Sequence, residues 1–60
     1  MRWYVWTTYG LINGMTRYYF HATTKIPLHR VGVYSYKEVN AINRSEAIKL
    51  ARRLHRNGEI

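Results

Sequence analysis

The segment WYVWTTYGLINGMTRYYFHATT, residues 3–24, decides the fold because one turn signal divides two strand-like runs. Both runs are rich in aromatic and β-branched residues, which suit a pleated and half-buried surface. Between them, Asn13 and Gly14 tolerate the positive φ that a two-residue type I′ turn requires at both central positions. The segment therefore predicts an antiparallel β-hairpin.

This turn also predicts the register of the hairpin, in which Ile12 lies opposite Met15 and side chains alternate between two faces. Gly10 is a candidate for a β-bulge that would disturb the alternation. One face is expected to form the core and comprises Trp3, Val5, Thr7, Tyr9, Leu11, Tyr18, Phe20 and Ala22. The other face combines aromatic and basic side chains and comprises Tyr4, Trp6, Thr8, Ile12, Met15, Arg17, Tyr19 and His21.

A third strand is predicted after the break at Pro27, which cannot donate a ladder hydrogen bond. Residues 30–37 carry the alternating pattern, and it extends toward Ala41. An alternative is a short helical turn at residues 35–38, where serine and glutamate have capping-box spacing. We favour the strand because residues 39–43 are poor helix formers.

A C-terminal amphipathic helix is predicted over residues 44–57. Asn43 is a good N-cap with Glu46 three residues later, although Ser45 is an alternative cap. Gly58 suits the position that follows the end of a helix. The apolar side of the helix comprises Ala47, Ile48, Leu50, Ala51 and Leu54.

These elements predict one small domain of class α+β and order ββ(β)α over all 60 residues. A three-stranded antiparallel sheet, made of the N-terminal hairpin and the third strand, packs one face against the helix. A chain of this length buries a small core, and it has no cysteine with which to form a disulfide. Stability must then come from the aromatic core, a partner or self-association, so a homodimer is one expectation.

The composition is strongly basic, with ten lysines and arginines, three glutamates, no aspartate and a formal net charge of +7. No acidic residue precedes Glu38, so the predicted hairpin carries only positive charge. A charge of this kind attracts polyanions and their protein complexes. No signal peptide or membrane-spanning segment is predicted, so we expect a cytoplasmic protein, in a host cell if it is viral, without a membrane partner.

The aromatic and basic face of the sheet is the first candidate binding site. Exposed aromatic rings beside basic groups suit base stacking, but Trp, Tyr and Arg also dominate protein interfaces. Packing among the rings themselves is a third interpretation. The candidate residues are Tyr4, Trp6, Arg17, Tyr19, His21, Tyr34 and Tyr36.

Basic side chains outside that face form a second candidate site, for phosphate or for an acidic partner. Most of them fall on the polar side of the predicted helix, where a simple solvated face is the alternative. The residues are Lys25, Arg30, Lys49, Arg52, Arg53 and Arg56.

Catalysis and metal binding have little support in the sequence. The three histidines are widely spaced, with no second ligand at helical spacing, so no metal site is predicted. Glu46 is better explained as a capping residue, and no aspartate is present to complete an acid–base pair. The chain also lacks a glycine-rich phosphate loop. We therefore expect a non-enzymatic protein without cofactors.

Residues 39–51, VNAINRSEAIKLA, combine a strand ending in Val-x-Ala, a capped turn and a Glu-Ala-x-x-x-Ala helix start. This arrangement resembles that of many very small phage-encoded proteins, including inhibitors of host RNA polymerase and some anti-CRISPR proteins. The resemblance covers about a quarter of the chain and transfers no functional residue. The basic charge departs from the acidic, DNA-mimicking members of that group but is compatible with members that act by contacting protein.

Two functions follow as expectations. The first is a small accessory protein, encoded by a phage or mobile element, that inhibits or modulates a host nucleic-acid-processing complex by protein contact through the aromatic face. The alternative is a module that binds nucleic acid directly, with the basic helix face on phosphates and the aromatic rings stacked on bases.

Overall fold

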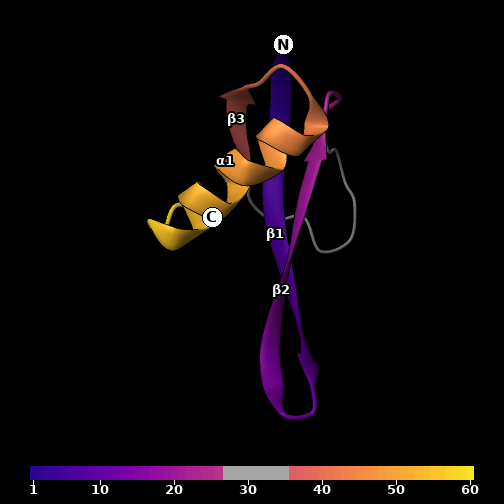
Figure 1. The fold of residues 1–60 in the computed structure, drawn as a ribbon, viewed down its shortest axis with the longest axis vertical. Helices are drawn as coiled ribbons and strands as arrows, with labels where there is room; N and C mark the ends of the chain where they lie inside the picture. Colours follow the sequence, from indigo (N-terminus) through magenta and orange to yellow (C-terminus); the bar gives the residue numbers. More distant parts are fainter. Residues whose placement is uncertain (27–35) are drawn as a thin grey trace.

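The computed structural model describes residues 1–26 and 36–60, and it has the predicted α+β architecture. Strands β1 (Arg2–Ile12), β2 (Met15–Thr23) and β3 (Lys37–Asn40) form one antiparallel sheet in the order β2-β1-β3. The helix α1 (Arg44–Arg56) lies across one face of this sheet (Figure 1). The long strand β1 is therefore central and contacts every other element.

The hairpin has the predicted turn and register. Asn13 and Gly14 have φ values of 52° and 76°, and Ile12 pairs with Met15. The bulge expected at Gly10 is absent, because Gly10 pairs directly with Arg17 in an unbroken ladder. A Cβ atom at Gly10 would meet the Tyr19 ring only at an ordinary contact distance of 4.0 Å, so no close approach requires a glycine there.

A third strand is present, as predicted. Residues 30–35 of the predicted segment lie outside the described residues, and the described strand β3 comprises Lys37–Asn40. Its extended backbone makes the alternative of a helical turn wrong for residues 37 and 38. β3 pairs antiparallel with the start of β1, where Trp3 lies opposite Val39. The Ala41 amide donates to the Met1 carbonyl at 2.9 Å and extends this pairing by one bond.

The helix begins and ends where its capping residues predict. Asn43 is the N-cap, and its side-chain oxygen accepts a hydrogen bond from the Glu46 amide at 2.9 Å. Gly58 has a φ of 78°, and its amide donates to the His55 carbonyl at 3.0 Å. The Glu59 amide donates to the Leu54 carbonyl at 2.9 Å, which completes a Schellman motif.

The core is small and lies at one end of the molecule. Its fully enclosed side chains are Val5 from β1 and three alanines, Ala41, Ala47 and Ala51. The small alanine side chains allow α1 to lie close to the sheet. Further apolar side chains, most of them larger, surround this centre and are only partly buried; they are Trp3, Phe20, Ala22, Val39, Leu50, Leu54 and Ile60.

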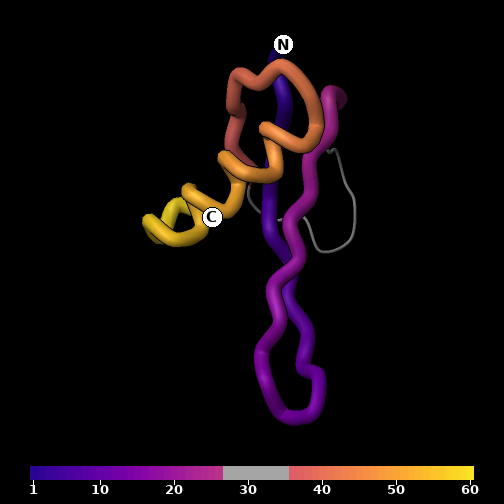
Figure 2. The backbone as a smooth tube through the Cα atoms, viewed as in Figure 1, coloured from indigo at the N-terminus to yellow at the C-terminus, as the bar shows by residue number. Residues whose placement is uncertain are grey.

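The turn end of the hairpin extends beyond the helix. The predicted core was therefore wrong for residues of β1 at this end. Tyr9 and Leu11 were expected inside but are 73% and 74% exposed. The backbone tube in Figure 2 shows the turn end of β1 and β2 continuing past α1. A strand of 11 residues spans roughly 36 Å, whereas a helix of 13 residues spans roughly 20 Å. The helix is thus too short to cover the whole face.

Candidate binding surfaces of the hairpin and the helix

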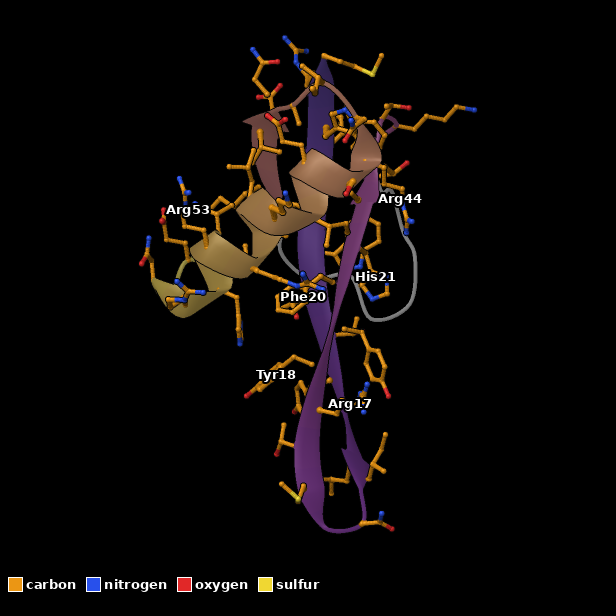
Figure 3. The ribbon with its side chains drawn as sticks, viewed as in Figure 1. Arg17, Tyr18, Phe20, His21, Arg44 and Arg53 are labelled. Atoms are coloured by element: carbon orange, nitrogen blue, oxygen red, sulfur yellow. The ribbon has the colours of Figure 1, made fainter. Side chains whose placement is uncertain are left out.

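One face of the sheet carries the predicted aromatic residues on the side opposite to α1. The register places them together because they alternate with the core residues along each strand. We call the following set the aromatic sheet face: Tyr4 and Trp6 from β1, Arg17, Tyr19 and His21 from β2, and Tyr36 directly before β3. In Figure 3, Arg17 and His21 project from β2 away from Tyr18 and Phe20, which lie on the helix side.

The rings at the centre of the aromatic sheet face are engaged with one another. Trp6 and His21 are cross-strand neighbours whose rings stack with centroids 5.2 Å apart and planes inclined by 16°. The Thr8 hydroxyl oxygen lies 2.8 Å from Nε2 of His21 and fixes that ring. Tyr4 meets Tyr36 edge to face at 5.6 Å. Each pair therefore turns one flat ring surface toward its neighbour rather than toward a ligand.

The outer members of this face are open to solvent. Tyr19 is 43% exposed and Tyr36 is 41% exposed, and Arg17 is exposed beside them. Tyr4, Trp6 and His21 are half-buried. None of the described strands and helices covers these residues, so tyrosine rings, a guanidinium group and the edges of the Trp6–His21 pair form an open mixed surface.

An ion pair lies at the end of the aromatic sheet face that is nearest to the N-terminus. The Arg2 guanidinium contacts the Glu38 carboxylate across β1 and β3. The pKa of Arg2 is raised, first by the hydrogen bond with the Tyr4 side chain and then by the charge of Glu38. Both partners are mostly exposed, so this pair contributes little to stability.

The turn half of the hairpin is a second exposed apolar surface, and our sequence analysis did not predict it. Tyr9 and Leu11 lie on the helix side, and Ile12 and Met15 lie on the other side. Ile12 is 45% exposed and Met15 is 73% exposed. A comparison of the expected strand and helix lengths would have found this surface, because the helix could not reach the turn.

The predicted basic residues of the helix are all exposed, but they do not adjoin the aromatic sheet face. α1 packs on the opposite side of the sheet, so its polar side points away from the aromatic rings. The residues concerned are Lys49, Arg52, Arg53 and Arg56. Lys25 is exposed just after β2, whereas the predicted site residues Arg30 and Tyr34 lie outside the described residues. One ligand strand thus cannot lie flat on both predicted sites at once.

A smaller cluster joins the end of α1 to β2 on the helix side. His55 packs against Tyr18 with ring centroids 4.4 Å apart and against Phe20 at 5.6 Å. Nδ1 of His55 lies 3.1 Å from the Ile60 backbone oxygen, which orients the ring. The Arg52 guanidinium lies 5.7 Å from the centre of the Phe20 ring, so it is anchored beside β2.

Residues 1–26 and 36–60 were searched for a candidate metal site and for a helix that could span a membrane. No group of three or more His, Cys, Asp or Glu residues gathers there in a way that could hold a metal ion. The one helix of this part of the chain is neither long nor apolar enough to cross a membrane. Comparisons with protein-family models, curated proteins and solved structures gave no match.

Proposed function

We propose that this chain is a small non-enzymatic accessory protein of the kind that phages and mobile elements encode. It docks on a protein of a host nucleic-acid-processing complex through the aromatic sheet face and inhibits or modulates that complex. The observation that carries the proposal is a sheet face rich in Tyr, Trp and Arg that none of the described strands and helices covers. These residue types contribute most of the binding energy in protein interfaces.

The arrangement of the rings favours a protein partner over stacked bases. Base stacking requires a flat ring surface that is open to the ligand. Trp6, the largest ring of the face, already stacks on His21, and Tyr4 meets Tyr36 edge to face. One flat face of the Trp6 ring is thus occupied, and the most exposed groups, the Tyr19 and Tyr36 rings and the Arg17 side chain, suit a mixed protein surface.

The net charge supports a partner from the nucleic-acid machinery. Complexes that act on nucleic acids hold polyanions, and a chain of formal charge +7 is steered toward those polyanions and toward acidic surfaces of the proteins, not toward their basic channels. Inhibition by occupation of such a surface requires no catalytic group, in agreement with the expectation from the sequence.

The test is affinity purification of the tagged chain from nuclease-treated extract of its source cells, followed by reconstitution with the purified partner. The wild-type chain and the control Arg53→Ala, changed on the outer side of the helix, should retain the same partner. Trp6→Ala and the exposed variant Tyr19→Ala should lose it while the far-UV circular dichroism stays native. Equal recovery by all four chains, or no recovery after nuclease treatment, would contradict the proposal.

Direct nucleic-acid binding remains the second candidate because five lysine and arginine side chains of α1 are exposed, the four predicted ones and Arg44. If three or four of them contact duplex phosphates, log K should fall with log salt concentration with a slope of about −3 to −4. Fluorescence anisotropy of labelled single-stranded and duplex oligonucleotides measures this slope. Replacement of Lys49, Arg53 and Arg56 by glutamine should then abolish binding, whereas Trp6→Ala should leave it unchanged.

A further inference from the structure

The outer edge of β2 has no strand partner among the described residues. β2 lies at the edge of the sheet, and no other described strand pairs with it there. Natural edge strands are commonly blunted by charged side chains, proline, a bulge or extreme shortness. β2 has nine residues, contains no proline, keeps an unbroken register with β1, and carries one charged side chain, Arg17. Its outward backbone groups are therefore a template for a further strand.

The register identifies those outward groups. In a two-residue hairpin the pair next to the turn, Ile12 and Met15, exchanges both backbone hydrogen bonds, and bonded pairs then alternate along the ladder. The Thr7 hydroxyl donates to the Tyr19 carbonyl at 2.9 Å, consistent with a Tyr19 carbonyl that faces β1. The residues whose amides and carbonyls point away from β1 are Thr16, Tyr18, Phe20 and Ala22.

The charges around this edge are positive on both faces of the sheet. Arg17 projects on the aromatic sheet face, and Arg52 lies beside Phe20 on the helix face. Lys25 follows the end of the strand. β2 itself contains no carboxylate, and the carboxylate nearest in the sheet, Glu38, lies beyond β1 in β3 and pairs with Arg2.

We infer that the outer edge of β2 accepts an extended acidic segment of the partner protein as a fourth strand of the sheet. This inference rests on the proposed function and states how the partner binds. Backbone hydrogen bonds to Tyr18 and Phe20 provide affinity, as in other cases of strand addition. Carboxylates at alternate positions lie across from Arg17, and the intervening apolar side chains extend the surface of Tyr18 and Phe20.

A second copy of the chain fits this edge less well. Two chains that each carry a formal charge of +7 repel each other when their edges meet. Antiparallel pairing of β2 with itself, centred on Tyr19, would also place Arg17 across from His21. The same positive charge disfavours self-pairing and attracts an acidic segment.

Amide hydrogen exchange on the ¹⁵N-labelled chain tests the inference, with a synthetic peptide of alternating Glu and Val as the probe. Exchange at Tyr18 and Phe20 should slow about tenfold or more on saturation, because these amides gain a partner. The amides of Arg17 and Tyr19 already bond to β1 and should not change. A peptide of alternating Lys and Val should have no effect.

Chemical synthesis provides a variant that removes one outward donor and keeps every side chain. N-methylation of Phe20 should abolish binding of the Glu–Val peptide, whereas N-methylation of Thr24, beyond the end of β2, should not. Three outcomes would overturn the inference: no protection at saturating peptide, equal protection by the Lys–Val peptide, or protection that rises with chain concentration without peptide. The last outcome would assign the edge to a second copy.

The two proposals fail separately. If the peptide leaves the β2 amides unprotected but Trp6→Ala still abolishes partner recovery, the strand addition is wrong and the docking face stands. If the β2 amides are protected but no partner is recovered, or all variants recover it, the edge binds acidic strands and the proposed function is wrong.

Discussion

Val5 and Leu11 lie on the same strand and the same face, yet they should differ strongly in their contribution to stability. Val5 is fully buried beneath α1, and Leu11 is 74% exposed beyond it. Val5→Ala removes two methyl groups, about 1.6 kcal/mol at roughly 0.8 kcal/mol per group, and the cavity brings the loss to about 2–3 kcal/mol. Leu11→Ala should change the free energy of unfolding by less than about 0.5 kcal/mol.

Thermal unfolding followed by circular dichroism measures both effects. A loss of about 2 kcal/mol lowers the Tm of so small a domain by roughly 8–16 °C. That is a large fraction of a total stability of roughly 3–9 kcal/mol for 60 residues. Low protein concentration, with the oligomeric state checked by ultracentrifugation, keeps association out of the comparison. Equal destabilisation by Leu11→Ala would refute the reasoning, because it would mean that the turn half of the hairpin is buried.

Four further changes test individual features of the fold. Asn43→Ala should lower the free energy of unfolding in urea by about 1 kcal/mol, because the Glu46 amide loses its side-chain acceptor. An unchanged free energy would contradict this role of Asn43, because it would mean that another group caps the helix equally well. Gly14→Ala places a side chain at a φ of 76° and should cost about 1–2 kcal/mol, again by urea unfolding. Trp3→Phe should be nearly neutral despite the smaller ring, since Nε1 of Trp3 is buried without a hydrogen-bond partner among the described residues and its removal recovers about 1–3 kcal/mol. The pKa of Arg2 is raised, so its contact is fully present below the ordinary guanidinium pKa and is lost only as the pH rises above it. Arg2→Gln should therefore leave the shape of the stability profile between pH 6 and 10 unchanged.

The parts of the fold that could be predicted depend on local chemistry. Asn13 and Gly14 specify a turn with positive φ, and the turn determines which side chains face each other for the whole hairpin. Asn43 and Gly58 likewise mark the two ends of the helix through their own hydrogen bonds and backbone angles. The membership of the aromatic sheet face followed directly from this register.

The parts that could not be predicted depend on distances between elements. Leu11 follows the core pattern of its strand, but it lies beyond the reach of α1 and is exposed. The basic side of the helix and the aromatic sheet face are each apparent in the sequence. Only the packing of α1 on one face shows that they point in opposite directions. The pairing of Lys37–Asn40 with the start of β1 likewise depends on contacts distant in the sequence, which no local signal indicates.

The most direct test of the central claim compares photo-crosslinking from two exposed positions, Tyr19 on the aromatic sheet face and Arg53 on the outer side of α1. A photoreactive amino acid replaces each residue in turn, and the products are identified in extract with and without nuclease treatment. If a protein docks on the aromatic sheet face, position 19 should give one strong crosslink to it, and position 53 should give none to the same protein. Crosslinks from position 53 alone that disappear with nuclease would contradict the claim and place nucleic acid on the helix.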